Sequence, residues 1–265
     1  MPYTRSVTNR DTKQSLSLLE RVDLAIASRM VGRSPAEDEL AAAQRVIDAM
    51  RRPHPGDATF VAALLRLRGF VVDDRDVTDA LTGRPGRLSP LTQEHRLARG
   101  LQSCLERVRE RALGAEPPDG WFLVDLFRTM TGELPRFRNN ELRRGPPWDA
   151  LLYVTHPPHH ELRSLLDSFD AKHCYRDVPA VFQGLHPVRQ AFRILWRFAR
   201  IAPFPDFNTV VAWLGMNAWL LAKGFPLLPA ERGDQELLAR LLGGPPPTRI
   251  VQFEARLLEQ FGIAA

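Results

Sequence analysis

The stretch from Thr209 to Lys223 constrains the fold more than any other part of the chain, because it is a helical sequence with apolar residues on nearly every face. An ordinary surface helix has one apolar stripe and one polar face, so a helix without a polar face must lie inside the protein. The preceding residues 187–200 carry large apolar side chains at helical spacing and predict a partner helix that packs against it. The sequence therefore predicts a mainly α-helical fold with residues 209–223 at its centre.

Capping and stop signals predict further helices on both sides of this pair. A capping box with proline at the first helical position lies at residues 34–37. Other helices are expected over residues 57–67, 77–81, 89–113, 121–130, 159–169, 234–242 and 248–261. Residues 136–156 include a strand-like segment broken by prolines and are predicted to form an irregular β-hairpin. The glycine and prolines of 114–118 suggest a division into an N-terminal helical region, residues 1–115, and a core with C-terminal helices, residues 116–265.

Composition excludes several classes of function. The chain has 265 residues, of which 44% are apolar and 25% charged, and no apolar run is long enough to span a membrane, so no membrane partner is expected. The net charge of +5 would suit nucleic-acid binding, but nearly all basic residues are arginines interspersed with acids, as in residues 106–111, which argues against a nucleic-acid partner. Two cysteines, Cys104 and Cys174, and the absence of an apolar leader predict a cytoplasmic protein with reduced thiols. The oligomeric state is not determined by the sequence.

The loop between the two core helices carries the most specific motif. It reads Ala202-Pro-Phe-Pro-Asp-Phe-Asn-Thr-Val210. This loop resembles the signature of the Fic family, His-Pro-Phe-x-(Asp/Glu)-Gly-Asn-Gly-Arg-x-x-Arg, whose members mostly transfer AMP from ATP to a protein hydroxyl. Pro203, Phe204, Asp206 and Asn208 keep the family's residues and spacing. The resemblance implies a Fic-like helical bundle with one β-hairpin flap.

The groups that carry the family's reaction are replaced. Ala202 takes the place of the base histidine, Phe207 and Thr209 replace the two loop glycines, and Val210 and Trp213 replace the two arginines. An alanine cannot accept the proton of an attacking hydroxyl, a function that typically contributes ~10²–10⁴-fold. Without the glycines and arginines, the loop also lacks the close backbone approach and the positive charge that hold phosphate at a helix N-terminus. No cofactor is therefore expected, and binding of ATP with magnesium is doubtful.

The resemblance covers roughly residues 58–245 and includes an inhibitory-helix-like segment. Residues 65–71 occupy the place of the family's Ser-x-x-x-Glu-Gly motif, with Arg68 at the glutamate position. In the family that glutamate pairs with the second motif arginine, which here is Trp213. One hypothesis is that Arg68 stacks on Trp213 as a cation–π pair. The alternative is that Arg68 points to solvent and Trp213 is an ordinary core residue.

Residues 134–138, which end at Arg138, are similar to the family's lead-in to a target-docking flap, and residues 155–162 match the flap's exit. A retained hairpin could take up an extended peptide by strand addition. The edge of this flap is predicted to be Leu151, Leu152, Tyr153 and Val154. The His-Pro-Pro-His-His run at 156–160 is a weak metal signal because two prolines interrupt its spacing, and no metal site is predicted.

Two roles remain open for the retained polar residues of the loop. Asp206 matches the family's metal carboxylate and is the candidate catalytic residue, and Asn208 matches its phosphate-side amide. The favoured interpretation is that one of them only caps the helix that starts at Thr209. The candidate ligand-binding residues are Arg68, Ala202, Phe204, Asp206, Phe207, Asn208, Thr209 and Trp213.

Three functions are compatible with these residues. The first is a degenerate Fic-like protein that has lost AMP transfer and acts by binding or regulating a protein or peptide partner. The second is a repurposed enzyme whose relined pocket takes an apolar or anionic small molecule, with Arg68 holding a carboxylate and Asp206 acting as acid or base. The third is residual nucleotidyl transfer with an unorthodox base.

Overall fold

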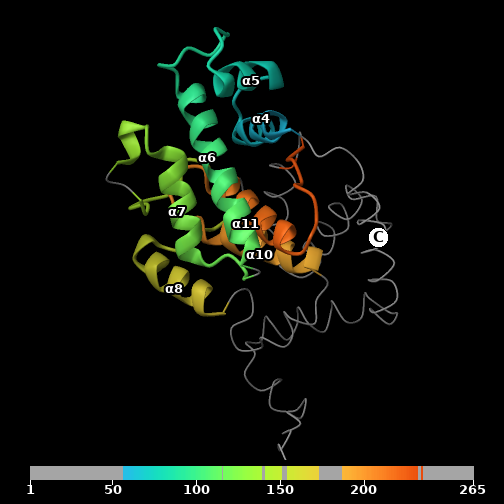
Figure 1. The fold of residues 1–265 in the computed structure, drawn as a ribbon. Helices are drawn as coiled ribbons and strands as arrows, with labels where there is room; N and C mark the ends of the chain where they lie inside the picture. Colours follow the sequence, from blue (N-terminus) through green and yellow to red (C-terminus); the bar gives the residue numbers. More distant parts are fainter. Residues whose placement is uncertain are drawn as a thin grey trace, which may run out of the picture.

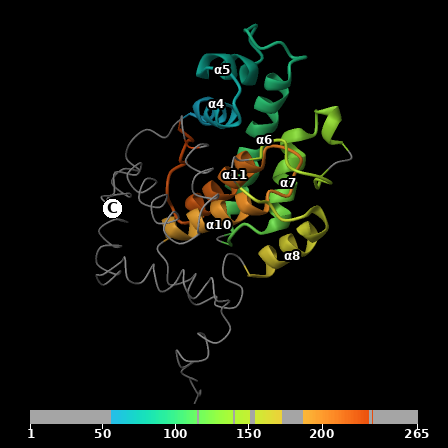
Figure 2. The same cartoon turned by 180° about the vertical axis from the view of Figure 1, so that it is seen from behind.

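The computed structural model describes residues 56–114, 116–138, 141–150, 154–172, 187–231 and 234, and the regular elements in these ranges are all helices (Figure 1). Helices α10 and α11 form the central antiparallel pair, α6 and α7 lie across α11, and α4 and α5 cover one end while α8 lies beside α7 (Figures 1 and 2). Their bounds are α4 Asp57–Arg68, α5 Asp74–Thr82, α6 Gln93–Leu113, α7 Gly120–Thr131, α8 Leu162–Lys172, α10 Pro187–Ile201 and α11 Asn208–Ala222, with short 3₁₀ helices η1 Pro135–Phe137 and η2 His159–Glu161.

Helix α11 is the core helix that the sequence predicts. Every residue from Asn208 to Leu220 is buried, and the helix contacts α4, α6, α7 and α10. A fully apolar helix is stable only when other elements cover all of its faces, which these four helices do. The neighbouring helices also approach closely, because a side chain at Gly100 of α6 would lie 2.3 Å from the carbonyl oxygen of Met130 in α7.

The helix ends agree with the sequence signals to within a few residues. Gly69 ends α4 in the left-handed conformation, with φ of 100°. Helix α5 starts earlier than predicted because Asp73 and Asp76 form a reciprocal capping box. Helix α6 starts later than predicted because Thr92, and not Ser89, is its N-cap residue.

The predicted β-hairpin is not seen in the described part of residues 136–156. Residues 135–137 form η1, and residues 141–150 contain no strand. Pro146 and Pro147 have no N–H to donate to a ladder, and the N–H groups of Arg143 and Trp148 bond to carbonyls of the 202–207 loop. Val154, predicted to lie at a free edge, is half-buried and packs against the core.

Several predictions lie outside the described residues. They include the helices predicted at residues 34–50, 234–242 and 248–261, the flap residues Leu151, Leu152 and Tyr153, and Cys174. The division at residue 115 stays a prediction. Within the described ranges, the helices are too short or too polar to traverse a bilayer.

Candidate functional site

The core loop, residues 202–207, keeps a glycine-like backbone without glycine. It begins at Ala202 with φ of 42° and ends at Phe207 with φ of 63°, and these are the non-glycine residues with positive φ in the described ranges. The left-handed conformation costs an ordinary residue roughly 1–2 kcal/mol. Burial offsets this cost at Phe207, whose ring is 1% exposed, stacks on Phe70 at 6.3 Å and meets Phe137 edge-on at 5.8 Å. Packing of the Phe207 ring therefore accompanies its left-handed backbone and fills the space beside the loop.

The N-terminus of α11 is occupied by a carboxylate of the protein itself. The backbone N–H of Asn208 donates to Asp149 Oδ2 at 2.6 Å, and the Asn208 side-chain amide donates to Asp149 Oδ1 at 2.7 Å. This is where the free N–H groups and dipole of a helix favour an anion. Burial raises the pKa of Asp149 above its ordinary value, although the hydrogen bonds from Asn208 oppose the shift.

Asp149 therefore accepts the hydrogen bond from the first backbone N–H of α11. The side chains of Asp206 and Asn208 do not cap this helix. The N-cap residue is Phe207, and it makes no side-chain cap. Asn208 Oδ1 instead accepts from the backbone N–H of Phe204 at 2.8 Å, and the Asn208 amide also donates to the Phe204 carbonyl at 2.9 Å. The expectation that Asp206 or Asn208 caps a helix beginning at Thr209 is wrong, because Asn208 bonds to Phe204 and Asp149 while Asp206 accepts from Arg68, Arg136 and the Phe207 N–H.

Asp206 is enclosed by protein donors. Arg68 donates through Nε to Oδ1 at 2.5 Å and through Nη2 to Oδ2 at 3.1 Å. Arg136 Nη2 lies 3.4 Å from Oδ2, and the N–H of Phe207 donates to Oδ1 at 2.8 Å. The Asp206 side chain is 3% exposed, so both of its oxygens are engaged and neither is directed at solvent.

Arg68 connects α4 to the core loop, but through different partners from those predicted. Its guanidinium pairs with Asp206 and lies 5.7 Å from the ring centroid of Phe207. Trp213 is fully buried and its Nε1–H donates to the carbonyl of Leu228 at 2.8 Å, so the proposed Arg68–Trp213 stack is wrong. Burial opposes the charge on Arg68, but the bonds and charge of Asp206 outweigh it and hold the pKa of Arg68 above its ordinary value.

Residues 141–150 form a strap over the core loop. Backbone N–H groups donate from Arg143 to Pro203 at 2.9 Å and from Trp148 to Pro205 at 2.6 Å. The Arg143 side chain donates to the carbonyls of Ala202 at 2.6 Å and Pro157 at 2.5 Å. Because Arg143 is 6% exposed, burial holds its pKa below the ordinary arginine value. The strap is therefore fixed to the core loop by backbone and side-chain hydrogen bonds.

One histidine lies near the position of the missing base. His156 Nδ1 is 3.0 Å from the carbonyl of Arg200, so Nδ1 carries the proton. Its Nε2 is buried and makes no hydrogen bond to the described residues. Burial lowers the pKa of His156 and keeps the ring neutral. His159 and His160 are exposed.

The other predicted site residues fill space. Ala202 and Thr209 are buried, and Phe204 is fully buried and stacks on Phe127 with centroids 4.2 Å apart. Arg138 is exposed and lies apart from the core loop on the outer side of the strap. Three further residues of the site were not predicted, namely Arg136, Arg143 and Asp149. Each forms hydrogen bonds with the core loop or the start of α11, about 60–70 residues away in the chain, and no local spacing pattern marks such a contact.

Comparison with solved structures identifies the fold. A Fic domain-containing signalling protein from Bacteroides thetaiotaomicron superimposes with a TM-score of 0.66 at 17% identity, covering 85% of this chain and 95% of the other. A fragment of Fic-1 from C. elegans gives a TM-score of 0.57 at 14% identity, over 92% and 76% of the two chains. A Fic family protein from Desulfovibrio desulfuricans gives 0.55 at 17% identity, over 98% and 74%.

Comparison of the sequence alone finds less. No family model matches the chain, and no curated protein matches it. The likeness to Fic domains is therefore one of fold, at 14–17% sequence identity.

Proposed function

We propose that this Fic-fold chain has lost nucleotidyl transfer and acts by binding a protein or peptide partner. The observation that carries the proposal is the Asp149 carboxylate on the first N–H of α11. An anion of the protein already occupies the helix N-terminus where the resemblance would place phosphate. A nucleotide would have to displace a buried carboxylate that accepts two hydrogen bonds from Asn208 and is 7% exposed.

Three further features support loss of the reaction. Ala202 supplies no base, and its carbonyl is bound by Arg143. Asp206, the metal carboxylate of the resemblance, is engaged by Arg68 and Arg136 and has no oxygen left for magnesium. The ring of Phe207 fills the space beside the loop. Nucleotide binding would therefore require several contacts to break together.

A small-molecule enzyme is supported less well. The cavities that the described residues form near the strap, of about 540 and 220 Å³, are lined by residues of α7, η1 and the strap. Neither is lined by Asp206, Phe207 or Trp213, which are the residues proposed to face a substrate. Small-molecule substrates bind in concave sites. The candidate catalytic residue, Asp206, lines neither of these two cavities.

Calorimetric titration of ATP with magnesium tests the proposal. We expect no measurable binding at millimolar nucleotide, and no label on the protein or on added proteins after incubation with α-³²P-ATP. Titration of the Asp149→Ala variant provides the internal comparison, because removing the carboxylate frees the Asn208 N–H. Wild-type binding tighter than roughly 100 μM, about −5.5 kcal/mol, or transfer of label, would refute the proposal and restore a transferase role.

A further inference from the structure

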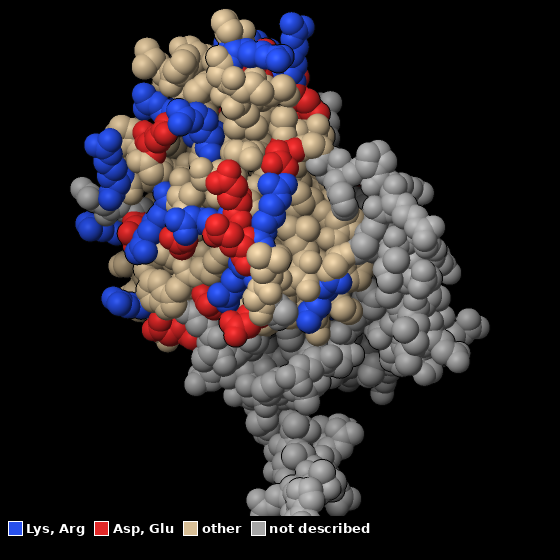
Figure 3. All heavy atoms as spheres, in the orientation of Figure 1, with Lys and Arg blue, Asp and Glu red and all other residues tan. Residues whose placement is uncertain are grey.

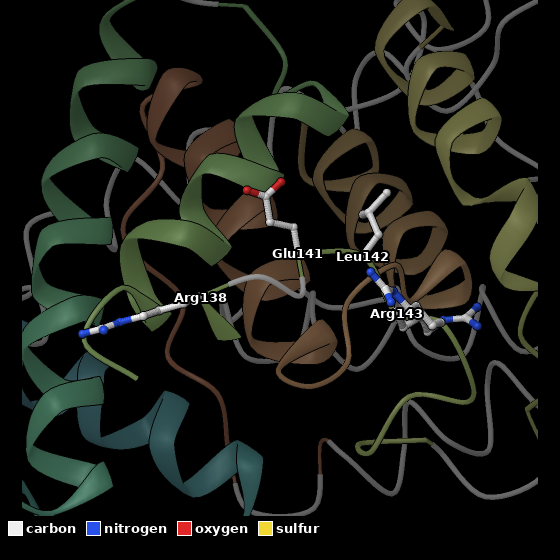
Figure 4. A pocket seen from close by; sticks show the side chains of 5 residues that line it. Arg138, Glu141, Leu142 and Arg143 are labelled. Carbon is white, nitrogen blue, oxygen red and sulfur yellow. The ribbon is translucent and has the colours of Figure 1, made fainter. Parts of the chain in front are cut away.

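Two adjoining hollows lie on the outer side of the strap. The larger, of about 540 Å³, is lined by Arg138, Glu141, Leu142, Arg143 and Arg144 (Figure 4). The smaller, of about 220 Å³, shares Arg138 and Glu141 and is also lined by Phe127, Arg128, Thr131, Gly132 and Phe137. The two hollows are here called together the arginine groove, whose lining is mainly charged and includes Phe127 and Phe137 in the smaller hollow.

The charge of this groove is positive. Arg138 and Arg144 are exposed, and among the described residues neither forms an ion pair. Glu141 is the acid in the walls, and Arg128 holds it through two bonds of 2.7 and 2.5 Å. Arg143 bonds to carbonyls and has no carboxylate partner among the described residues. The groove thus presents guanidinium groups whose charge the described part of the protein does not neutralise.

The arrangement favours an extended anionic chain over a single ion. In Figure 4 Arg138 points to one side of the groove and Arg143 lies at the other, so these two guanidinium groups do not converge on one point. A peptide rises about 3.3 Å per residue, so successive acidic side chains can reach both ends. The hollow above Phe127 and Phe137 would take one apolar side chain of the same peptide.

A nucleic acid fits less well. Proteins that hold single strands combine a basic groove with aromatic faces on which successive bases stack. Both aromatic residues of this groove are buried, at 1% exposure for Phe127 and 3% for Phe137, so they offer an edge for one side chain and no stacking platform. On the face in Figure 3, basic and acidic side chains are interspersed among uncharged ones, without a continuous basic track over the described residues.

We propose that the arginine groove binds an acidic segment of a partner protein, with Arg138 and Arg144 contacting carboxylates and the smaller hollow taking an apolar side chain. This rests on the proposed function and names the chemistry of its partner. This binding surface differs from the predicted flap edge, where a peptide would bind by strand addition. Residues 141–150 contain no strand, and Val154 packs against the core.

The test uses a fluorescein-labelled peptide of eight glutamates with one central phenylalanine, followed by fluorescence anisotropy at low salt. The full chain is compared with Arg138→Glu/Arg144→Glu and with the control Arg75→Glu/Arg84→Glu. Arg75 and Arg84 are exposed arginines at α5, so the control makes the same change in net charge away from the groove. We expect the groove variant to weaken binding at least tenfold, about 1.4 kcal/mol, and the control less than twofold.

A gain-of-affinity variant gives a second, independent readout. Glu141→Gln removes the acid of the groove, releases Arg128 and should tighten peptide binding about threefold, because one repulsion is lost and one cation is gained. The triple variant, which adds Arg138→Glu and Arg144→Glu to Glu141→Gln, should lose this gain in affinity. A loss of folded protein cannot explain the tighter binding of Glu141→Gln.

Three results would overturn the inference. They are no binding of the peptide at 100 μM wild-type protein, equal losses in groove and control variants, or tighter binding of a twelve-nucleotide single-stranded RNA with the same dependence on Arg138 and Arg144. If the peptide fails while ATP also fails to bind, this inference is wrong and the proposed function stands. If ATP binds, the proposed function fails whatever the peptide does.

Discussion

Replacing Arg68 with methionine should lower the free energy of unfolding by about 2–3 kcal/mol. The change removes two charge-assisted hydrogen bonds to Asp206 and leaves that carboxylate 3% exposed. Breaking a fully buried pair typically costs about 3–5 kcal/mol. A smaller value is expected here because Arg68 is 27% exposed and because Arg136, at 3.4 Å, and the Phe207 N–H remain as donors. The reciprocal change, Asp206→Asn, should cost only about 1–1.5 kcal/mol, since the released guanidinium can reach water.

Urea unfolding followed by tryptophan fluorescence measures both variants and the double variant. The double-mutant cycle should give a coupling of about 1–2 kcal/mol. The midpoint of thermal unfolding should fall by about 5–10 °C for Arg68→Met. Arg75→Met, at an exposed position of α5, is the matched control and should change stability by less than about 0.5 kcal/mol. The argument that Arg68 docks α4 on the core loop is refuted if Arg68→Met is as mild as this control or if the coupling is zero.

Further predictions concern other buried groups. Because the pKa of Asp149 is raised in the folded state, the folded chain keeps this proton to higher pH than the unfolded chain. The stability of wild type relative to Asp149→Asn should therefore decrease as pH rises from about 4 toward 7. Urea unfolding at several pH values measures this difference, and a flat or rising difference would contradict the prediction. Gly100→Ala should cost about 2–3 kcal/mol because its methyl group would meet backbone, whereas Gly114→Ala, whose methyl group would lie 3.4 Å from the Arg111 carbonyl oxygen in ordinary contact, should be nearly neutral in the same assay. Burial raises the pKa of the Cys104 thiol, so in a Cys174→Ser background it should react with Ellman's reagent only after unfolding, and rapid native-state labelling would show that the core opens.

Helices were predictable because their signals are local. The apolar faces of residues 209–223 dictate burial whatever surrounds them, and Gly69 and Gly83 end α4 and α5 where the sequence indicates. The hairpin was not predictable in the same way. Its β-rich residues have local strand propensity, but prolines remove donors from a ladder, and the remaining N–H groups of the strap find partners in the core loop.

The site was only half predictable, for a physical reason. The motif spacing identified Asp206, Asn208 and the replaced residues, because these positions follow one another in the chain. Their hydrogen-bond partners come from α4 and from the strap, and a charge on a distant segment leaves no periodic trace in the sequence. The resemblance identifies Arg68, but the sequence does not show which residue faces it, so both a stack on Trp213 and a solvent-exposed Arg68 were open and the Asp206 partner was not predicted.

The two ionic contacts of the core loop have a common consequence. At Arg68 a cation holds the loop's own carboxylate, and at Asp149 an anion holds the loop's own helix N-terminus. A magnesium–nucleotide complex would supply positive charge to the carboxylate and negative charge to the helix N-terminus. Here Arg68 supplies the positive charge to Asp206, and Asp149 supplies the negative charge to α11. Loss of the base alone would leave a site able to bind nucleotide without reacting. Under the proposed function, the contacts of Arg68 and Asp149 remove the electrostatic reason for nucleotide binding, which loss of the base alone would not do.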